Sequence, residues 1–137
     1  KEHAENEVIP SLPDGLRVLL AEDNDINAEI VMGMLKSSNI KCIRTKNGQD
    51  AVKAEKRHDF DVILMDCQMP IMDGHTASKL IRSEGRNKDT VRIIALTANA
   101  FIEDKNACLE AGMNAHLSKP IRRQVLFDCI ARELARV

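Results

Sequence analysis

Val62-Ile-Leu-Met65 is a run of four large apolar residues, and Asp66 follows it directly. A strand that is apolar along its whole length is buried on both faces, which is typical of a parallel sheet covered by helices. Similar runs occur in Arg17–Ala21 and Val91–Leu96. These three segments predict an α/β domain built around a central parallel sheet.

Helical patterns alternate with these strands along the chain. Segments with helical spacing of apolar residues are residues 24–38, 47–58, 76–81, 101–111 and the stretch from Ile121 onward. Two shorter strands are expected at residues 42–45 and 115–117, and the first of them alternates like an edge strand. Five strand–helix units with short connections predict a doubly wound α/β sheet.

The composition excludes several classes of protein. The net charge is only −1, and Trp and Tyr are absent, which argues against a nucleic-acid surface. The apolar runs are too short to cross a membrane, and the four cysteines form no close pair. The pattern favours reduced thiols in a cytoplasmic protein over a disulfide framework, a zinc site or a redox site. Residues 1–15 read as a polar linker, and residues 16–137 as one domain.

Polar residues follow four of the predicted strands. Glu22 and Asp23 come after the first strand, Asp66 after the third, Thr97 after the fourth and Lys119 after the fifth. The carboxyl ends of parallel strands meet at one edge of a sheet, so we expect these side chains to converge there. Crowded carboxylates repel one another unless they share a proton or hold a cation, and all-oxygen donors favour Mg²⁺. With a nearby lysine and hydroxyl, a carboxylate here is equipped to accept a phosphoryl group.

Four motifs resemble the response-regulator receiver family, in the order that the family has them. They are Leu19-Leu-Ala-Glu-Asp-Asn24, Ile63-Leu-Met-Asp-Cys-Gln-Met-Pro70 with Met72-Asp-Gly74, Ala95-Leu-Thr-Ala98 and Leu117-Ser-Lys-Pro120. The resemblance covers nearly the whole chain after Gly15 and implies the receiver fold, a five-stranded parallel sheet of order 2-1-3-4-5 with five helices. The residues of the second motif, together with Asn24 and Asn27 after the acidic pair, look most like those of receivers in hybrid sensor histidine kinases.

The resemblance implies a metal site and a phosphoacceptor. Carried over by position, Asp66 is the phosphoacceptor and Asp23 a direct ligand of Mg²⁺. Glu22 holds a metal-bound water, and the backbone carbonyl of Gln68 is a further ligand. Gln68 and Asn99 match positions that tune how fast the phosphoryl group is lost.

The resemblance also implies groups that contact the phosphoryl oxygens. Thr97 hydrogen-bonds them, Lys119 pairs with them and with Asp66, and the small Ala98 admits the donor. The bond between Lys119 and Pro120 matches one that is often cis in the family. His116 departs from the family, which usually has Tyr or Phe at this switch position, and the alternative is a partly exposed histidine without a switching role.

The function implied is Mg²⁺-dependent phosphoryl transfer from a phosphohistidine to Asp66. The resemblance also implies a phosphoacceptor that promotes its own phosphorylation. The chain ends at Val137 with no output domain, so we expect a monomeric C-terminal receiver of a hybrid kinase that passes the group to a histidine phosphotransfer domain.

The first helix is expected to bury one stripe of apolar side chains, namely Ile26, Ile30, Val31, Met34 and Leu35. Met32 lies off this stripe and Ile26 at its edge, so the two form a candidate docking patch.

Other functions remain open at this point. A receiver that binds a partner kinase without being phosphorylated is the main alternative, although it has no need of the full Asp23, Asp66, Thr97 and Lys119 set. A haloacid-dehalogenase-type phosphatase has a second Asp where Gln68 stands. A flavin-binding module needs a phosphate-cradling loop, and acidic side chains after the first strand repel phosphate.

Overall fold

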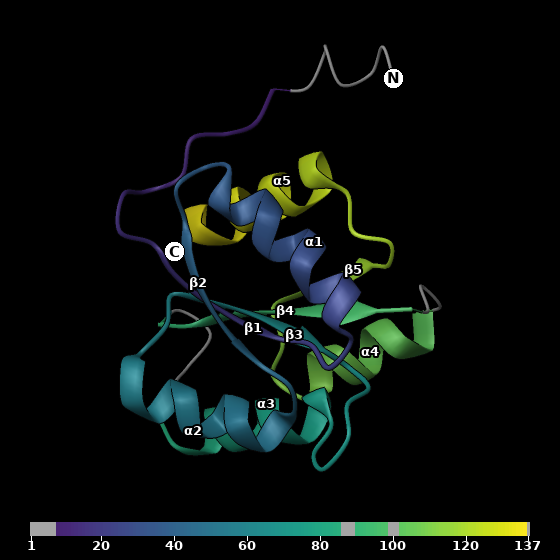
Figure 1. The fold of residues 1–137 in the computed structure, drawn as a ribbon. Helices are drawn as coiled ribbons and strands as arrows, with labels where there is room; N and C mark the ends of the chain where they lie inside the picture. The colour runs from purple at the N-terminus through teal and green to yellow at the C-terminus, as the bar shows by residue number, and fades with distance from the viewer. Residues whose placement is uncertain (1–7, 86–89, 99–101, 137) are drawn as a thin grey trace.

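The computed structural model of the chain describes residues 8–85, 90–98 and 102–136 (Figure 1). The strands are β1 (Arg17–Ala21), β2 (Lys41–Thr45), β3 (Val62–Asp66), β4 (Arg92–Thr97) and β5 (Ala115–Ser118). The helices are α1 (Asp25–Lys36), α2 (Gly48–His58), α3 (Gly74–Ser83), α4 (Ile102–Glu110) and α5 (Arg123–Ala135). Strand and helix alternate throughout, as the sequence predicts.

The five strands form one parallel sheet in the order β2-β1-β3-β4-β5. Helices α1 and α5 cover one face of the sheet, and α2, α3 and α4 cover the other (Figure 1). This confirms the doubly wound α/β fold and its strand order. β3 lies at the centre, and all five of its residues are buried, which explains why its sequence is apolar without alternation.

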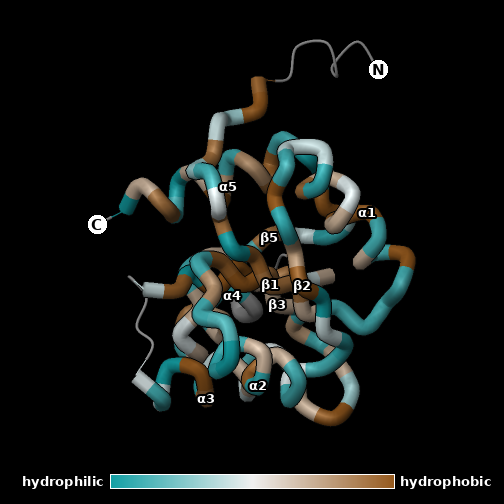
Figure 2. The backbone as a smooth tube through the Cα atoms, turned by 60° about the vertical axis from the view of Figure 1, so that its left-hand side comes forward, coloured by the Kyte–Doolittle hydropathy of each residue, from teal (hydrophilic) through white to brown (hydrophobic). Residues whose placement is uncertain are grey.

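Successive strand residues point to opposite faces of the sheet, so they pack into two separate cores. On the side of α1 and α5, the strand residues are Val18, Leu20, Val62, Leu64, Ile94 and Leu96. On the side of α2, α3 and α4, they are Leu19, Ala21, Ile63, Met65, Ile93 and Ala95. Figure 2 shows the hydrophobic backbone gathered at the strands in the middle of the molecule. We call the core on the side of α1 and α5 the upper core, and the core on the side of α2, α3 and α4 the lower core.

The buried face of α1 differs from the prediction. Its buried residues are Ala28, Val31 and Leu35, while Ile26 and Ile30 are 69% and 51% exposed. The helix packs on the sheet through a stripe that begins at a small residue, which lets its backbone come close to the strands. The prediction was right for Val31 and Leu35, and Met34 packs against the upper core, but it was wrong for Ile26 and Ile30 because it placed large apolar side chains in the core and overlooked the small Ala28.

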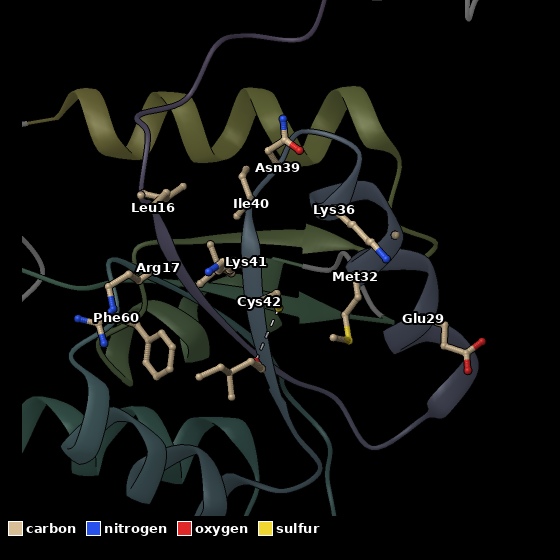
Figure 3. Close-up of a pocket in the computed structure, with 14 residues that line it drawn as sticks. Leu16, Arg17, Glu29, Met32, Lys36, Asn39, Ile40, Lys41, Cys42 and Phe60 are labelled. Carbon is tan, nitrogen blue, oxygen red and sulfur yellow. Dashed lines mark hydrogen bonds between the residues drawn. The ribbon is translucent and has the colours of Figure 1, made fainter.

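Met32, expected to be exposed, packs against the upper core and lines a hollow beside the edge strand β2. This hollow has a volume of about 1170 Å³ and lies between α1, β1 and β2 (Figure 3). Its labelled side chains include Leu16, Ile40 and Phe60 (Figure 3). It lies away from the carboxyl ends of the strands and contains none of the predicted site residues.

The described part of the N-terminal segment lies against α5. Gln124 Nε2 donates to the carbonyl oxygen of Val8 at 2.8 Å, and the Val8 N–H donates to Gln124 Oε1 at 3.1 Å. Ile9 and Leu12 pack against the upper core. The division of the chain at residue 15 stays a prediction. None of the described helices is long and apolar enough to span a membrane.

Candidate functional site

A cleft of about 510 Å³ opens at the carboxyl edge of the sheet, where ligands bind in folds of this kind. It is lined by Glu22, Asp23, Asn24, Asn27, Asp66, Cys67, Gln68, Asp73, His75, Thr97, Ala98 and Lys119. All six residues predicted to bind metal or phosphoryl oxygens are among them. The topology therefore brings together residues that lie up to 97 positions apart in the chain, from Glu22 to Lys119.

Three carboxylates cluster in this cleft. One oxygen from each of Glu22, Asp23 and Asp66 lies within 4.8 Å of the other two. Lys119 Nζ is 3.0 Å from Glu22 Oε1 and 3.2 Å from Asp66 Oδ2, so one ammonium group bridges two of the carboxylates. Glu22 and Asp66 are 1% and 4% exposed, whereas Asp23 is exposed. Negative charge thus exceeds the positive charge of the lysine that contacts it.

The electrostatics of the cluster favour a further cation. Burial raises the pKa of Asp66 from its ordinary value of 3.8 to about 7, and the Glu22 carboxylate adds to the rise. Lys119 and the backbone N–H of Gln68, which is 3.3 Å from Asp66 Oδ1, oppose it. Burial alone lowers the pKa of Lys119, but its hydrogen bonds and its attraction to the two carboxylates outweigh burial and leave that pKa raised. Lys119 stays charged, and a bound cation would help to ionise Asp66.

Two neighbouring elements hold the loop after β1 in place. The Asn24 side chain caps α1 by accepting from the Asn27 N–H at 2.9 Å, and the Asn24 N–H donates to Glu22 Oε2 at 3.1 Å. Arg44 on β2 donates from Nε and Nη2 to the Glu22 carbonyl oxygen, at 3.0 and 2.7 Å. Its Nη1 lies 2.8 Å from Asp25 Oδ1. The acidic pair is therefore fixed by the helix cap and by one arginine.

The loop after β3 folds back tightly onto the strand. The Gly74 N–H donates to the carbonyl oxygen of Cys67 at 3.1 Å, and the Asp73 side chain caps α3 by accepting from the Thr76 N–H at 2.8 Å. A Cβ atom on Gly74 would overlap the carbonyl oxygen of Asp66. Only glycine lets α3 begin this close to Asp66.

The remaining predicted residues come from β4 and β5. Thr97 is the last residue of β4 and is 6% exposed, and its carbonyl oxygen accepts from the Lys119 N–H at 2.8 Å. The peptide bond between Lys119 and Pro120 is cis, as the family resemblance implies. His116 is half-buried on β5, pairing with Ala95 of β4. Asn99 lies outside the described residues.

Comparison with known proteins agrees with this geometry. Residues 18–131 match the family model of the response regulator receiver domain. The chain belongs to this family. As a receiver domain, it resembles hybrid signal transduction histidine kinase M of Dictyostelium discoideum, with 44% identity over 119 residues, 84% of this chain and 5% of the relative. The chain spans between 4% and 13% of the length of the curated relatives it matches.

Solved receiver domains share the fold. The receiver domain of sensor histidine kinase PA1611 from Pseudomonas aeruginosa is 38% identical, with a TM-score of 0.81 over 89% of this chain and 99% of that one, and its structure has a magnesium ion coordinated in the active site cleft. The receiver domain of Ssk1 from Saccharomyces cerevisiae, solved with the histidine phosphotransfer protein Ypd1, is 32% identical. Its TM-score is 0.78 over 91% of this chain and 94% of that one.

The donor set of this receiver domain suits a hard divalent cation. Carboxylate and carbonyl oxygens are the ligands that Mg²⁺ prefers, and one carboxylate oxygen from each of Glu22, Asp23 and Asp66 lies within 4.8 Å of the other two in the cleft. The raised pKa of Asp66 shows that the charged form of this group lacks full compensation. These residues therefore fit the ion seen in the relative.

Sequence patterns missed two residues that shape the site. Arg44 lies in the middle of an edge strand, where an arginine normally indicates only a solvated face, and its role depends on β2 pairing beside β1. Gly74 reads as a loop breaker but is the first residue of α3, in contact with the backbone of Asp66. Arg44 could have been found from the expected pairing of its strand with the strand that precedes Glu22 and Asp23.

Proposed function

We propose that this receiver domain accepts a phosphoryl group on Asp66, with Mg²⁺ bound by the acidic cluster. The observation that carries the proposal is the position of Asp66 at the end of the central strand, with two further carboxylates around it and Lys119 Nζ 3.2 Å from its Oδ2. This arrangement supplies a nucleophile, a site for a divalent cation and a fixed positive charge within one cleft.

In the proposed step, an Asp66 carboxylate oxygen attacks the phosphorus of a phosphohistidine. A phosphorus–oxygen bond forms as the phosphorus–nitrogen bond breaks, and the bonding pair leaves with the imidazole nitrogen, which takes up a proton. Bound Mg²⁺ supplies positive charge to the transferring oxygens. We assign Lys119 to balance the charge that remains on the acyl phosphate, and the hydroxyl of Thr97, the last residue of β4, to donate a hydrogen bond to it. Glu22 orients Lys119 through their 3.0 Å contact.

Exposed apolar residues on α1 suit a helical donor protein. Ile26 and Ile30 lie four positions apart, on the same face of α1, and both are more than half exposed. Ile30 also borders a small hollow with Lys119 and Pro120, so this face continues to the edge of the site. We define Ile26 and Ile30 as the α1 patch. The α1 patch replaces the predicted pair of Ile26 and Met32, because Met32 packs against the upper core. We propose that a histidine phosphotransfer domain docks there, since the Ssk1 relative is solved with such a protein.

Truncation of the α1 patch is expected to slow transfer from a protein donor. The double variant Ile26→Ala, Ile30→Ala removes two exposed side chains worth about 2 kcal/mol at an interface, which lowers the transfer efficiency roughly 30-fold. Transfer is measured from a phosphorylated histidine phosphotransfer protein, with yeast Ypd1 as the stand-in donor. Labelling by acetyl phosphate, which has no surface to dock, stays unchanged. Leu80→Ala on α3 is the control, and an equal loss there would contradict the patch.

The larger protein is proposed to be a hybrid sensor histidine kinase, because the relatives that this chain matches are of that kind. In such a protein the domain would work in the cytoplasm, where phosphohistidine donors are formed from ATP. All four cysteines belong to the described residues, and none is in a disulfide, which is compatible with a reducing compartment.

The test is the intact mass of the protein after incubation with acetyl phosphate, with and without Mg²⁺. We expect one phosphoryl adduct, dependent on Mg²⁺, in the wild type and in Asp128→Asn, an exposed aspartate on α5. Asp66→Asn keeps the fold and gives no adduct. An adduct that persists in Asp66→Asn would identify a different nucleophile. A folded wild type that stays unlabelled by acetyl phosphate and by a phosphohistidine donor would favour the alternative, a receiver that binds a partner kinase without phosphorylation.

A further inference from the structure

A second group of metal-ligating side chains lies beside the acidic cluster. Cys67 follows β3, His75 is in the first turn of α3 and Cys108 is in α4. One ligand atom from each lies within 4.8 Å of the other two. The two sulfur atoms are 3.7 Å apart, and Cys108 Sγ is 3.7 Å from His75 Nε2.

Two of the three separations match those of ligands around tetrahedral zinc. With a zinc–sulfur bond of about 2.3 Å and a zinc–nitrogen bond of about 2.0 Å, a tetrahedral angle places two sulfurs about 3.8 Å apart and a sulfur about 3.5 Å from a nitrogen. Both observed distances agree with these values within about 0.2 Å. A disulfide would need the sulfur atoms to come to about 2.0 Å, so the present geometry suits an ion between them better than a bond.

The surroundings of the cluster allow an ion to enter and be held. Cys67 and Cys108 are 8% and 2% exposed, so two soft ligands are shielded from water. His75 is half-buried and, with Cys67, lines the open cleft. An ion can therefore enter from the cleft, and a water molecule can complete its coordination from the same side.

We propose that Cys67, His75 and Cys108 form a zinc site, separate from the acidic cluster. The two clusters would prefer different metal ions, because two thiols and an imidazole favour a soft ion whereas carboxylates favour a hard one. Zinc at this position would join the end of β3, the start of α3 and α4 through one ion. It would fasten α4 to the strand that carries Asp66. The site does not depend on phosphorylation, since none of its ligands belongs to the phosphoryl chemistry.

The proposal is tested by adding Co²⁺, a spectroscopic substitute for Zn²⁺, to the reduced domain. We expect one equivalent to give the strong visible absorption of a tetrahedral ion and a near-ultraviolet thiolate-to-cobalt band. The chain has neither Trp nor Tyr, so that region is clear of their absorption. One equivalent of Zn²⁺ removes both bands, and a large excess of Mg²⁺ leaves them unchanged.

Cys108→Ser and His75→Ala are each expected to lower the affinity for Co²⁺ by about 100-fold. Cys42→Ser on β2 and His58→Ala at the end of α2 are the matched controls and keep the wild-type spectrum. Circular dichroism shows that each variant is folded, and His75→Ala keeps the test valid if loss of the buried Cys108 thiol unfolds the domain. Absence of the bands in the folded wild type, or an unchanged spectrum in His75→Ala, would overturn the three-ligand site.

Discussion

Gly74→Ala is expected to lower the free energy of unfolding by about 3 kcal/mol. The new methyl group would overlap the carbonyl oxygen of Asp66 and come within 2.9 Å of Met65 Cγ. Neither neighbour can give way easily, because one is strand backbone and the other is buried in the lower core. Any relief moves the backbone of Asp66, so labelling by acetyl phosphate falls together with stability.

Urea unfolding followed by circular dichroism measures this change. Gly33→Ala is the matched control, because a Cβ at Gly33 in the interior of α1 meets nothing within 4 Å. That variant should gain up to about 1 kcal/mol, since alanine is the better helix former. A loss of less than 1 kcal/mol in Gly74→Ala would show that the loop after β3 has more room than the structure gives it.

In the absence of Mg²⁺, the free energy of unfolding is expected to fall as the pH rises from about 4 to about 7. The pKa of Asp66 is about 7 in the folded domain and 3.8 ordinarily, so the folded state binds one proton more than the unfolded chain in this range. The loss is complete above pH 7 and amounts to roughly 2 to 4 kcal/mol. Burial beside Glu22, which penalises the charged form, is the cause.

The same proton competes with Mg²⁺. Below pH 7 the apparent affinity for Mg²⁺ should fall by up to about tenfold for each pH unit, which calorimetric titration at several pH values measures. Asp66→Asn is the control for both effects: its stability without Mg²⁺ lacks this slope, and its weaker Mg²⁺ binding varies little over the same range. An affinity in the wild type that is the same at pH 5.5 and pH 7.5 would contradict the raised pKa.

The sequence was enough to predict the fold and the position of the acidic cluster. Apolar strands without alternation indicate a parallel sheet, and a parallel sheet gathers its strand ends at one edge, so Asp23, Asp66, Thr97 and Lys119 could be placed together before any coordinates. Their roles remain predictions, but their convergence in one cleft is now observed.

What failed depended on contacts between elements that are distant in sequence. Ile26 and Ile30 were misassigned because α1 packs on the sheet at Ala28, a small residue that a hydrophobicity pattern passes over. The cluster of Cys67, His75 and Cys108 was missed for a related reason. Spacing rules detect ligands close together in sequence, whereas these ligands come from three elements.

The two cores, one on each face of the sheet, also bear on how such a domain can diversify. Side chains of the upper core and the lower core lie on opposite sides of the strand backbone, and substitutions that share no contacts usually act additively on stability. Selection can therefore alter α1 and α5 without epistatic cost to α2, α3 and α4. The exposed α1 patch can therefore change toward new partners without repacking of the lower core.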